Sequence, residues 1–363
     1  FKYRGGDRLK RIILTGGGTA GHVTPNLALI PKLQKEGWDV RYIGSKTGIE
    51  KELIEEQNIP YYGISSGKLR RYKDIKNLTD PFKVLAGGAE ALALIGKLKP
   101  NIIFSKGGYV TVPVVAAGWL RRVPVIIHES DITPGLANKL AFPFAKKICV
   151  NFPETLNHIP KEKGILTGTP IREELFQGKA TKGLKLCGFS DTKPILMMMG
   201  GSLGSVTINN VLRKALPSLL PFFNVIHICG KNNKDESLEN TKGYKQFEYV
   251  KEELPHLFAA ADIFISRAGA NSIAEILSLK KPNILIPLSA RASRGDQILN
   301  ARSFKNQGFS QVLEEENLTE ETLIEMVKDT YRNRHIYIEA MQKSQGANGI
   351  DTVMDLIRTN AKK

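Results

Sequence analysis

A glycine-rich loop with a histidine at its end is the first stretch of the sequence that could carry chemistry. Gly16, Gly18 and Gly21 form a G-x-G-x-x-G pattern directly after the apolar run 11–15, and His22 follows the last glycine. Glycines lack Cβ atoms, so the backbone can approach a phosphate closely while the following helix points N–H groups at it. A neutral histidine at a helix N-terminus could accept a proton. The stretch therefore predicts a phosphate or diphosphate site with a base beside it, unless it is only a structural turn with a packing histidine.

The same glycine spacing is the fingerprint of dinucleotide binding, which makes NAD an alternative ligand. A dinucleotide site needs a carboxylate at the tip of the second strand, about 20 residues further on, to hold a ribose. The candidate strand 38–44 carries no Asp or Glu at its tip, and Asp39 lies at its beginning, which is the wrong end. The sequence therefore favours another phosphate compound over NAD.

Polar residues follow two further strand candidates. In the segment 128–139, HESDITPGLANK, Glu129 and Asp131 could act as a base or bind hydroxyl groups, or could merely cap the end of the strand. The stretch GGSLGSVTIN is a second glycine loop, whose Ser202 and backbone amides could bind phosphate. Asn209 lies further along the helix after this loop, where a polar side chain facing the sheet would be unexpected.

The stretch SRAGANSIAEIL carries the most informative group of residues. Arg267 supplies a positive charge, and Ser272 and Glu275 lie three positions apart on one helix face. A carboxylate can accept hydrogen bonds from two hydroxyls of one ribose, whereas the structural alternative is a capping box with Ser272 as N-cap and Glu275 at N3. After the next strand and loop come three more polar side chains, Asp296, Gln297 and Asn300. No HExxH, Walker A or G-x-S-x-G motif occurs, so metal catalysis and serine hydrolysis have no support.

The elements that must position these residues follow a βαβ rhythm. Short apolar runs alternate with helical stretches, which predicts parallel sheets covered on both faces. The strand candidates are 11–15, 38–44, 101–108, 123–130 and KICVN near Cys149 in the first half, and PILMMMGGSLG, NVIHICG, DIFISRAGA and PNILIPL in the second. The rhythm restarts after the segment 164–176, and the stretches ILTGGGTAG and ILMMMGGSLG share an order of strand and glycines. We therefore expect two doubly wound α/β halves, each opening with a turn that can bind phosphate. A helix at the C-terminus is apolar at Ile350, Val353, Met354 and Ile357 and could pack back on either half.

Bulk properties narrow the classes of protein. The 363 residues exceed what one core usually serves, and 42% hydrophobic and 24% charged residues are typical of a globular protein in water. Three distant cysteines without CxxC spacing argue against a disulfide framework and favour a reducing compartment. The net charge of +16 favours an anionic partner, unless it only serves solubility. No apolar run is long enough to span a bilayer, and the N-terminal stretch lacks the apolar core of a signal peptide.

Seven motifs in this order closely resemble the MurG family of N-acetylglucosaminyltransferases, which complete the lipid-linked precursor of peptidoglycan. They are GGGTAGHVTP, KGGYVTVP, HESDITPGLANK, TGTPIREEL, GGSLGSVTIN, SRAGANSIAEIL and RGDQILNA, and the resemblance spans residues 10–360. It implies the GT-B fold, in which two Rossmann-like, doubly wound parallel-sheet domains face a cleft. Residues 9–165 would form the domain that binds the acceptor and the membrane, and residues 166–344 would bind UDP-N-acetylglucosamine. The helix at about 345–363 is a candidate addition to the first domain.

The resemblance implies a reaction and a set of residues. An inverting transfer would move N-acetylglucosamine from UDP-N-acetylglucosamine to undecaprenyl-diphosphate-linked N-acetylmuramoyl-pentapeptide, without a cofactor or metal ion. His22 is the first candidate for the base and Glu129 the second. The implied donor ligands are Thr19, Gly21, Arg172, Ser202, Asn209, Arg267, Ser272, Glu275, Gln297 and Asn300, and the implied acceptor side holds Gly17, Gly18, Tyr109 and His128. Two positions depart from the family pattern, since Asp131 replaces a frequent Asn and Leu203 replaces a frequent Gln.

An acceptor held in a membrane requires the enzyme to dock there. The resemblance therefore implies a peripheral protein on the cytoplasmic face of the bacterial cell membrane, active in cell-wall synthesis and thus in cell shape and division. Basic residues near anionic head groups contribute about 1 kcal/mol each. The expected contacts with an anionic membrane surface are Lys68, Arg70, Arg71, Leu78, Phe82, Leu85 and Trp119.

Other interpretations of these sequence features stay open. The residues expected at the membrane could instead form an ordinary solvated face with core leucines. Another UDP-sugar enzyme of the GT-B fold, such as a glycolipid synthase or a UDP-sugar epimerase, is the alternative function. A nucleic-acid binder, which the net charge alone would suggest, lacks interleaved aromatic residues and any recognised motif, so we expect no nucleic-acid partner.

Overall fold

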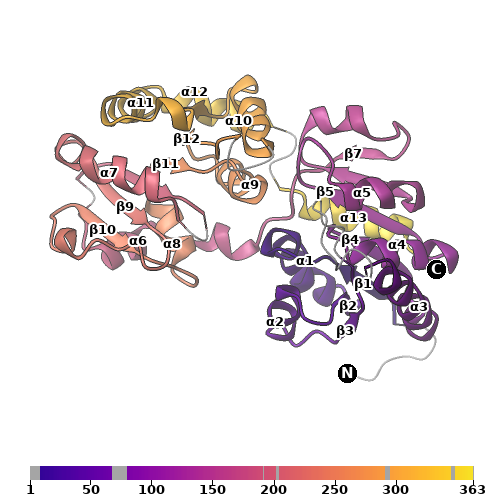
Figure 1. Cartoon of the computed structure of the whole chain (residues 1–363). Helices are drawn as coiled ribbons and strands as arrows, with labels where there is room; N and C mark the ends of the chain where they lie inside the picture. Colours follow the sequence, from indigo (N-terminus) through magenta and orange to yellow (C-terminus); the bar gives the residue numbers. More distant parts are fainter. Residues whose placement is uncertain are drawn as a thin grey trace. The chain divides into compact units, whose positions relative to one another are not determined.

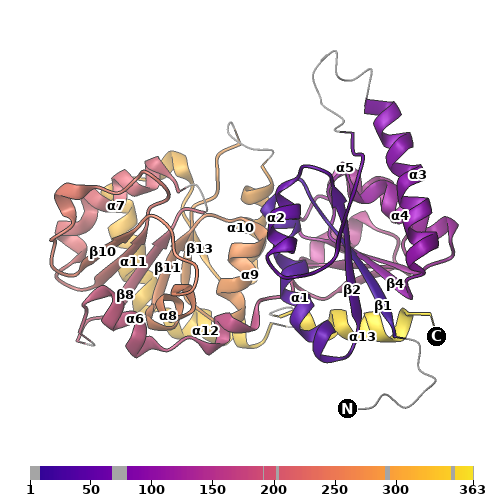
Figure 2. The ribbon, with the colours of Figure 1, turned by 90° about the horizontal axis from the view of Figure 1, so that it is seen from below.

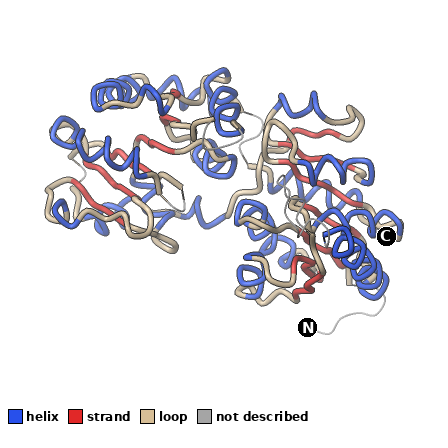
Figure 3. Tube along the Cα trace, viewed as in Figure 1, coloured by secondary structure: helices blue, strands red, loops and turns tan. Residues whose placement is uncertain are grey.

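Two sheets of parallel strands, each with helices packed against it, form the protein (Figure 3). The computed structural model describes residues 9–67, 80–190, 192–201, 204–290, 295–344 and 348–362, with the side chains of 80–82 excepted. Contacts within the chain divide it into two units, Phe1–Arg172 with Asn348–Lys363, and Glu173–Ala347. This division falls a few residues after the boundary at 165 and 166 that the sequence predicts.

The first unit is built on a seven-stranded parallel sheet with the order β3-β2-β1-β4-β5-β6-β7 (Figure 1). Its strands are β1 (Arg11–Thr15), β2 (Asp39–Ser45), β3 (Tyr61–Ile64), β4 (Ile102–Ser105), β5 (Val125–Glu129), β6 (Lys147–Val150) and β7 (Gly164–Leu166). Its helices are η1 (Ala20–His22), α1 (Thr24–Lys35), α2 (Ile49–Glu55), α3 (Asp80–Leu98), α4 (Thr111–Leu120), α5 (Leu136–Ala141), η3 (Phe142–Phe144), η4 (Pro153–His158) and α13 (Ile350–Asn360).

Helices cover both faces of this first sheet, which explains why its central strands are apolar throughout. Successive side chains of a strand point to opposite faces. Ile12 and Leu14 of β1 therefore pack in one buried cluster, together with residues of α1 and α13, whereas Ile13 packs in another, together with residues of α3 and α4. Burying apolar surface on both sides is the main stabilising term for such a sheet.

The last helix, α13, packs on the first unit although it follows the whole of the second (Figure 2). Its buried side chains join the cluster under α1. Two ion pairs tie the helices together, Lys32 with Asp351, and Glu36 with Arg358 at 2.6 Å. The C-terminal helix therefore belongs to the core of the first unit.

The second unit repeats this topology with six parallel strands in the order β10-β9-β8-β11-β12-β13. Its strands are β8 (Ile195–Met199), β9 (Asn224–Ile228), β10 (Tyr244–Phe247), β11 (Ile263–Ser266), β12 (Asn283–Leu285) and β13 (Gln311–Val312). Its helices are η5 (Glu173–Gln177), α6 (Ala180–Cys187), α7 (Val206–Leu219), η6 (Glu236–Leu238), α8 (Leu254–Ala260), α9 (Ala270–Ser278), α10 (Asp296–Asn306), η7 (Glu315–Asn317), α11 (Glu320–Arg332) and α12 (Arg334–Gln342). None of the helices in the described part of the chain is long and apolar enough to cross a membrane.

Candidate functional site

Two glycine loops of the first unit meet backbone against backbone at the carboxyl ends of β1 and β4. These are the adjacent strands at which the strand order reverses, where ligands bind in sheets of this kind. The N–H of Gly17 donates to the carbonyl oxygen of Gly107 at 3.1 Å. Gly108 has a φ of +96°, and a Cβ at this position would lie 2.2 Å from the oxygen of Gly17. The loop of Gly107 and Gly108, two glycines to which sequence reasoning gave no role, therefore shapes the first glycine loop.

A buried carboxylate lies beneath the first loop, and sequence reasoning missed it. Glu50 of α2 is fully buried, and it accepts hydrogen bonds from the N–H of Gly18 at 3.2 Å and the N–H of Ser45 at 3.0 Å. A Cβ at Gly17 would lie 2.5 Å from Oε1 of Glu50, so the glycine makes room for the carboxylate. Glu50 cannot reach a ribose from this position. The amides of Gly17 and Gly18 are thus used within the protein rather than directed at a ligand.

His22, in η1, is held in one tautomer by the first loop. Its Nδ1 lies 2.9 Å from the carbonyl oxygen of Gly17. A carbonyl oxygen can only accept, so Nδ1 carries the proton and the lone pair of the neutral ring is on Nε2. Burial and, next, the charge of Lys106 lower the pKa of His22 below its usual value, against the opposing effects of the Gly17 carbonyl, Asp131 and Glu50. The ring is therefore neutral at pH 7 and can take a proton on Nε2.

Glu129, the second candidate for the base, organises the loop after β5. Its carboxylate accepts hydrogen bonds from the N–H of Asp131 at 3.0 Å and of Gly135 at 3.2 Å, and from the side-chain amide of Asn138 at 2.8 Å. The side chain is buried. These three bonds commit the carboxylate to the loop, so the geometry favours His22 as the base.

Lys106 is a buried cation at this edge of the sheet that sequence reasoning also missed. The residue directly follows β4 and is 1% exposed, and its ammonium group donates to the hydroxyl of Ser130. Burial lowers the pKa of Lys106 to about 8, although the carboxylates of Glu129 and Asp131 act in the opposite direction. A lysine between an apolar strand and two glycines was the signal available in the sequence.

The two remaining acceptor-side residues differ in accessibility. His128 is 0% exposed, and its Nε2 lies 2.9 Å from the carbonyl oxygen of Gly168. Burial and the charge of Lys106 hold the pKa of His128 well below its usual range. His128 is therefore a neutral interior group in this arrangement, and its place on the acceptor side stays a prediction. Tyr109 directly follows Gly107 and Gly108 and is only partly buried, so a ligand can reach it.

In the second unit, the glycine loop after β8 lies above a buried polar network. Asn209 of α7 donates to the carbonyl of Cys229 at 2.8 Å and accepts from Nε2 of His227 at 2.8 Å. The hydroxyl of Tyr244 lies 2.7 Å from the other ring nitrogen of His227. Asn209 is 1% exposed, so its amide supports the end of β9, and its place in the donor site stays a prediction. Ser202 and Leu203 of this loop lie outside the described residues.

Arg267 joins three segments around the same edge of the second sheet. It is buried, it donates to the hydroxyl of Ser205 at 2.8 Å and it pairs with Glu315 of η7. It also donates to the carbonyls of Ile286 and Pro287. A guanidinium with these partners holds the loops together and has little surface left for a ligand.

Gln297 and Asn300 of α10 tie this helix to the loop that precedes α9. Oε1 of Gln297 accepts from the N–H of Leu288 at 3.0 Å and of Ala268 at 3.3 Å. Asn300 donates to the carbonyl of Ala268 at 3.1 Å and is 1% exposed. Asn300 is thus a buried support, whereas Gln297 and Asp296 keep part of their surface exposed.

The capping-box interpretation of Ser272 and Glu275 is wrong. Helix α9 begins at Ala270, its N-cap is Gly269, and no side chain caps it. Ser272 and Glu275 therefore lie inside the helix, and both are partly exposed on it. Backbone N–H groups in the first turn of a helix attract anions, so Ser272 lies where a phosphate can bind.

The other implied donor ligands lie on the first unit. Thr19 and Gly21 are exposed in the first glycine loop, and Arg172 is the last residue of that unit before the chain enters the second. Among the expected membrane contacts, Leu85 of α3 is 72% exposed and Trp119 of α4 is 53% exposed. The other membrane contacts lie outside the described residues, namely Lys68, Arg70, Arg71, Leu78 and the side chain of Phe82.

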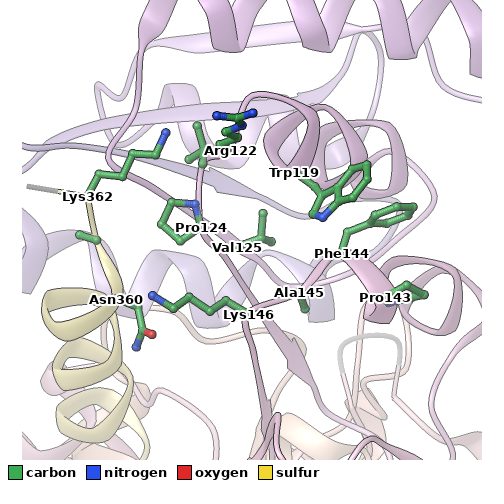
Figure 4. Close-up of a pocket in the computed structure, with 12 residues that line it drawn as sticks. Trp119, Arg122, Pro124, Val125, Pro143, Phe144, Ala145, Lys146, Asn360 and Lys362 are labelled. Carbon is green, nitrogen blue, oxygen red and sulfur yellow. The ribbon is translucent and has the colours of Figure 1, made fainter.

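Trp119 lies at the rim of a hollow of about 550 Å³ in the first unit (Figure 4). Its ring packs on Phe144 with the centroids 5.4 Å apart, and Arg122 and Lys146 also line the hollow. Val125, at the start of β5, forms part of its wall. The hollow is thus at the amino edge of the sheet, opposite the glycine loops and His22.

Both halves of the chain match one family of known proteins. Residues 12–150 match the glycosyltransferase family 28 N-terminal domain, and residues 195–357 match the glycosyltransferase family 28 C-terminal domain. The second match runs into α13, which packs on the first unit.

Individual relatives and solved structures resemble the chain along its length. The UDP-N-acetylglucosamine--N-acetylmuramyl-(pentapeptide) pyrophosphoryl-undecaprenol N-acetylglucosamine transferase of Clostridium tetani is 62% identical over 348 residues, which are 96% of this chain and 97% of that protein. The protein of the same name from Clostridium botulinum strain 657 is 60% identical over 98% of this chain and 100% of its own length. The crystal structure of Acinetobacter baumannii MurG has a TM-score of 0.78 at 27% identity and covers 96% of this chain and 99% of its own. A UDP-GlcNAc 2-epimerase from Neisseria meningitidis, at 12% identity, a TM-score of 0.67 and coverage of 96% and 99%, shares the fold alone.

Proposed function

The chain belongs to glycosyltransferase family 28, and from this premise we propose that it moves N-acetylglucosamine from UDP-N-acetylglucosamine to undecaprenyl-diphosphate-linked N-acetylmuramoyl-pentapeptide. The observation that carries the proposal is the 62% identity over 96% of the chain to a transferase with this name. The fold is GT-B, with two Rossmann-like parallel-sheet domains. The product would be the complete lipid-linked precursor of peptidoglycan.

His22 is the proposed base of the reaction. A hydroxyl oxygen of the muramoyl sugar attacks the anomeric carbon of the donor, the bond between that carbon and the UDP oxygen breaks, and the configuration inverts. The hydroxyl proton passes to Nε2 of His22, because Nδ1 already carries a proton and donates to Gly17. The lowered pKa of His22 keeps this lone pair available at neutral pH.

The first glycine loop is proposed to shape the acceptor side instead of wrapping a phosphate with all its amides. The N–H groups of Gly17 and Gly18 already donate within the protein. The exposed part of the loop, with Thr19 and Gly21, and the accessible Tyr109 remain to meet a substrate. Gly17 and Gly18 thus act through the loop's shape.

Helix α9 is proposed to hold the donor nucleotide. Its first turn has no side-chain cap and contains Ser272, so the diphosphate can bind there. Arg172 and Ser202 are further proposed diphosphate ligands, which the family resemblance implies. Glu275 is one turn further on and would accept the ribose hydroxyls. The buried residues Asn209, Arg267 and Asn300, together with the Oε1 of Gln297, would keep the surrounding loops in place.

Calorimetric titration of nucleotides tests the donor assignment. We expect UDP-N-acetylglucosamine to bind, UDP-glucose to bind less tightly, and NADH not to bind. Glu275→Gln should weaken UDP-N-acetylglucosamine binding by about tenfold, since a hydrogen bond to a charged group is worth about 1.5–3 kcal/mol. Glu325→Gln, an exposed change on α11, is the control and should leave binding unchanged. Binding of NADH, or an affinity for UDP-N-acetylglucosamine that Glu275→Gln leaves unchanged, would contradict the assignment.

We further propose that the protein docks peripherally on the cytoplasmic face of the bacterial membrane. Leu85 and Trp119 are exposed apolar side chains on α3 and α4, and Arg122 and Lys146 line the same hollow as Trp119 (Figure 4). Aromatic rings with adjacent cations suit the interface between acyl chains and anionic head groups. The net charge of +16 acts in the same direction.

A further inference from the structure

The loop that carries His22 lies between two buried side chains of opposite charge. On one side, Glu50 accepts the N–H of Gly18, and on the other, Lys106 directly follows β4. A Cβ at Gly16 would lie 3.2 Å from the Cβ of Lys106, so the lysine packs against the start of the loop. Their exposed fractions are 0% for Glu50 and 1% for Lys106, so neither can touch a substrate.

We propose that Glu50 and Lys106 are positioning residues for His22, which fix the orientation of its ring and set its protonation state from opposite sides. The role of Glu50 and Lys106 in catalysis rests on the proposed function, because it depends on His22 being the base of the transfer reaction. Their effect on the ring itself rests on geometry and charge alone.

The backbone of the first glycine loop fixes the orientation of the His22 ring. Glu50 holds the amide of Gly18 at 3.2 Å, and the carbonyl of Gly107 holds the amide of Gly17 at 3.1 Å. With both amides held, the carbonyl of Gly17 points at Nδ1 of His22, 2.9 Å away. This single contact leaves Nε2 as the proton acceptor.

Protonation of the ring responds to three charges in its surroundings. Lys106, after β4, disfavours the imidazolium, whereas Asp131, in the loop after β5, and Glu50, in α2, favour it. Burial lowers the pKa of Lys106 to about 8, so Lys106 is still charged in the range below the usual pKa of a histidine, where His22 titrates. The lysine therefore opposes the two carboxylates throughout that titration.

Titration of the His22 ring by NMR tests the proposal without any turnover. The chain has six histidines, and the His22 signal is assigned by its loss in His22→Gln. Lys106→Met should raise the pKa of His22 by about one pH unit, and Glu50→Gln should lower it by a smaller amount, as expected for nearby charges in a partly desolvated site. The charge-matched surface controls, Lys35→Met on α1 and Glu55→Gln on α2, should leave the pKa of His22 unchanged.

If both buried variants move the pKa of His22 in the same direction, or if neither moves it, the proposal is overturned. If Lys106→Met does not fold, Lys106→Gln makes the same change of charge and keeps a donor for Ser130. In a transfer assay, the acid limb of the kcat profile should move up in pH for the Lys106 variant and down for the Glu50 variant. Correct NMR shifts without any transfer activity would refute the proposed function and leave the inference about the ring intact.

Discussion

At the scale of single residues, the chemistry depends on one histidine ring whose tautomer is fixed. Nδ1 of His22 donates to the carbonyl of Gly17, so the lone pair lies on Nε2. The other candidate, Glu129, already accepts three hydrogen bonds from its own loop. The proposed base must take up a proton in each turnover, and the Nε2 lone pair of His22 has no role within its own loop, which is why we propose His22 and not Glu129.

Removal of the His22 ring should slow turnover far more than it weakens donor binding. General bases contribute about 100-fold to 10,000-fold, so we expect His22→Ala to lower kcat by about 100-fold or more while calorimetry shows UDP-N-acetylglucosamine affinity within a factor of about two. His158→Ala, an exposed histidine of the same unit, is the control and should retain activity. A His22→Ala enzyme with nearly normal kcat would exclude His22 as the base.

Sequence reasoning could predict residues beside the glycine pattern but not the side chains that pack beneath it. His22 was predictable because it directly follows the pattern. Glu50 was not, because G-x-G-x-x-G spacing says nothing about which neighbouring helix fills the space beneath the loop. Lys106 begins the motif KGGYVTVP, but the motif does not show that this lysine is buried against the first loop. The capping box at Ser272 failed for a related reason, since the same residues also fit a helix whose first residue, Ala270, comes three positions before the start at Ile273 that the box requires.

At the scale of elements, the central strands were predictable and the edge strands were not. The strands absent from the sequence-based reading are β3, β7, β10 and β13, which are the outermost strands of the two sheets. Edge strands are short and less buried, so they lack the continuous apolar run that marks a central parallel strand. The packing of α13 was left open by the sequence because an apolar helix face does not specify which sheet it covers.

The α13 helix should be needed for the stability of the first unit. Met354 is 0% exposed in the cluster beneath α1, and Met354→Ala should cost about 2–5 kcal/mol of unfolding free energy from lost burial and the cavity left behind. Native-state hydrogen exchange should then speed up in β1 and β4 and stay unchanged in β8 and β11. Thr352→Ala, an exposed change on the same helix, is the control. Faster exchange in the second sheet alone would contradict this packing.

At the scale of the whole molecule, one topology occurs twice and serves two tasks. Each unit presents a glycine loop at the switch point of its sheet, between β1 and β4 in the first and between β8 and β11 in the second. The first unit carries His22 and the exposed side chains proposed for the membrane, and the second carries α9 and its donor residues. Under the proposed function, the first unit takes the lipid-anchored acceptor and the second unit binds the nucleotide sugar.

Membrane docking should depend on anionic lipid and on Trp119. We expect co-sedimentation with vesicles that contain anionic phospholipid to exceed that with neutral vesicles and to weaken as salt is added, because the attraction is electrostatic. Trp119→Ala should reduce binding by about threefold or more, since it removes an interfacial aromatic ring. Phe222→Ala, which alters an aromatic side chain that is 55% exposed on the second unit, is the matched control. Binding that is independent of anionic lipid would refute the proposed surface.

The most direct measurement for the account as a whole is transfer of labelled N-acetylglucosamine. The protein is incubated with UDP-N-acetylglucosamine, labelled in the sugar, and with a lipid-linked muramoyl-pentapeptide analogue. The account predicts that the label appears on the lipid-linked muramoyl sugar with inverted anomeric configuration and that UDP is released in equal amount. Label that stays on the nucleotide, either unchanged or as the 2-epimer of the sugar, would contradict it.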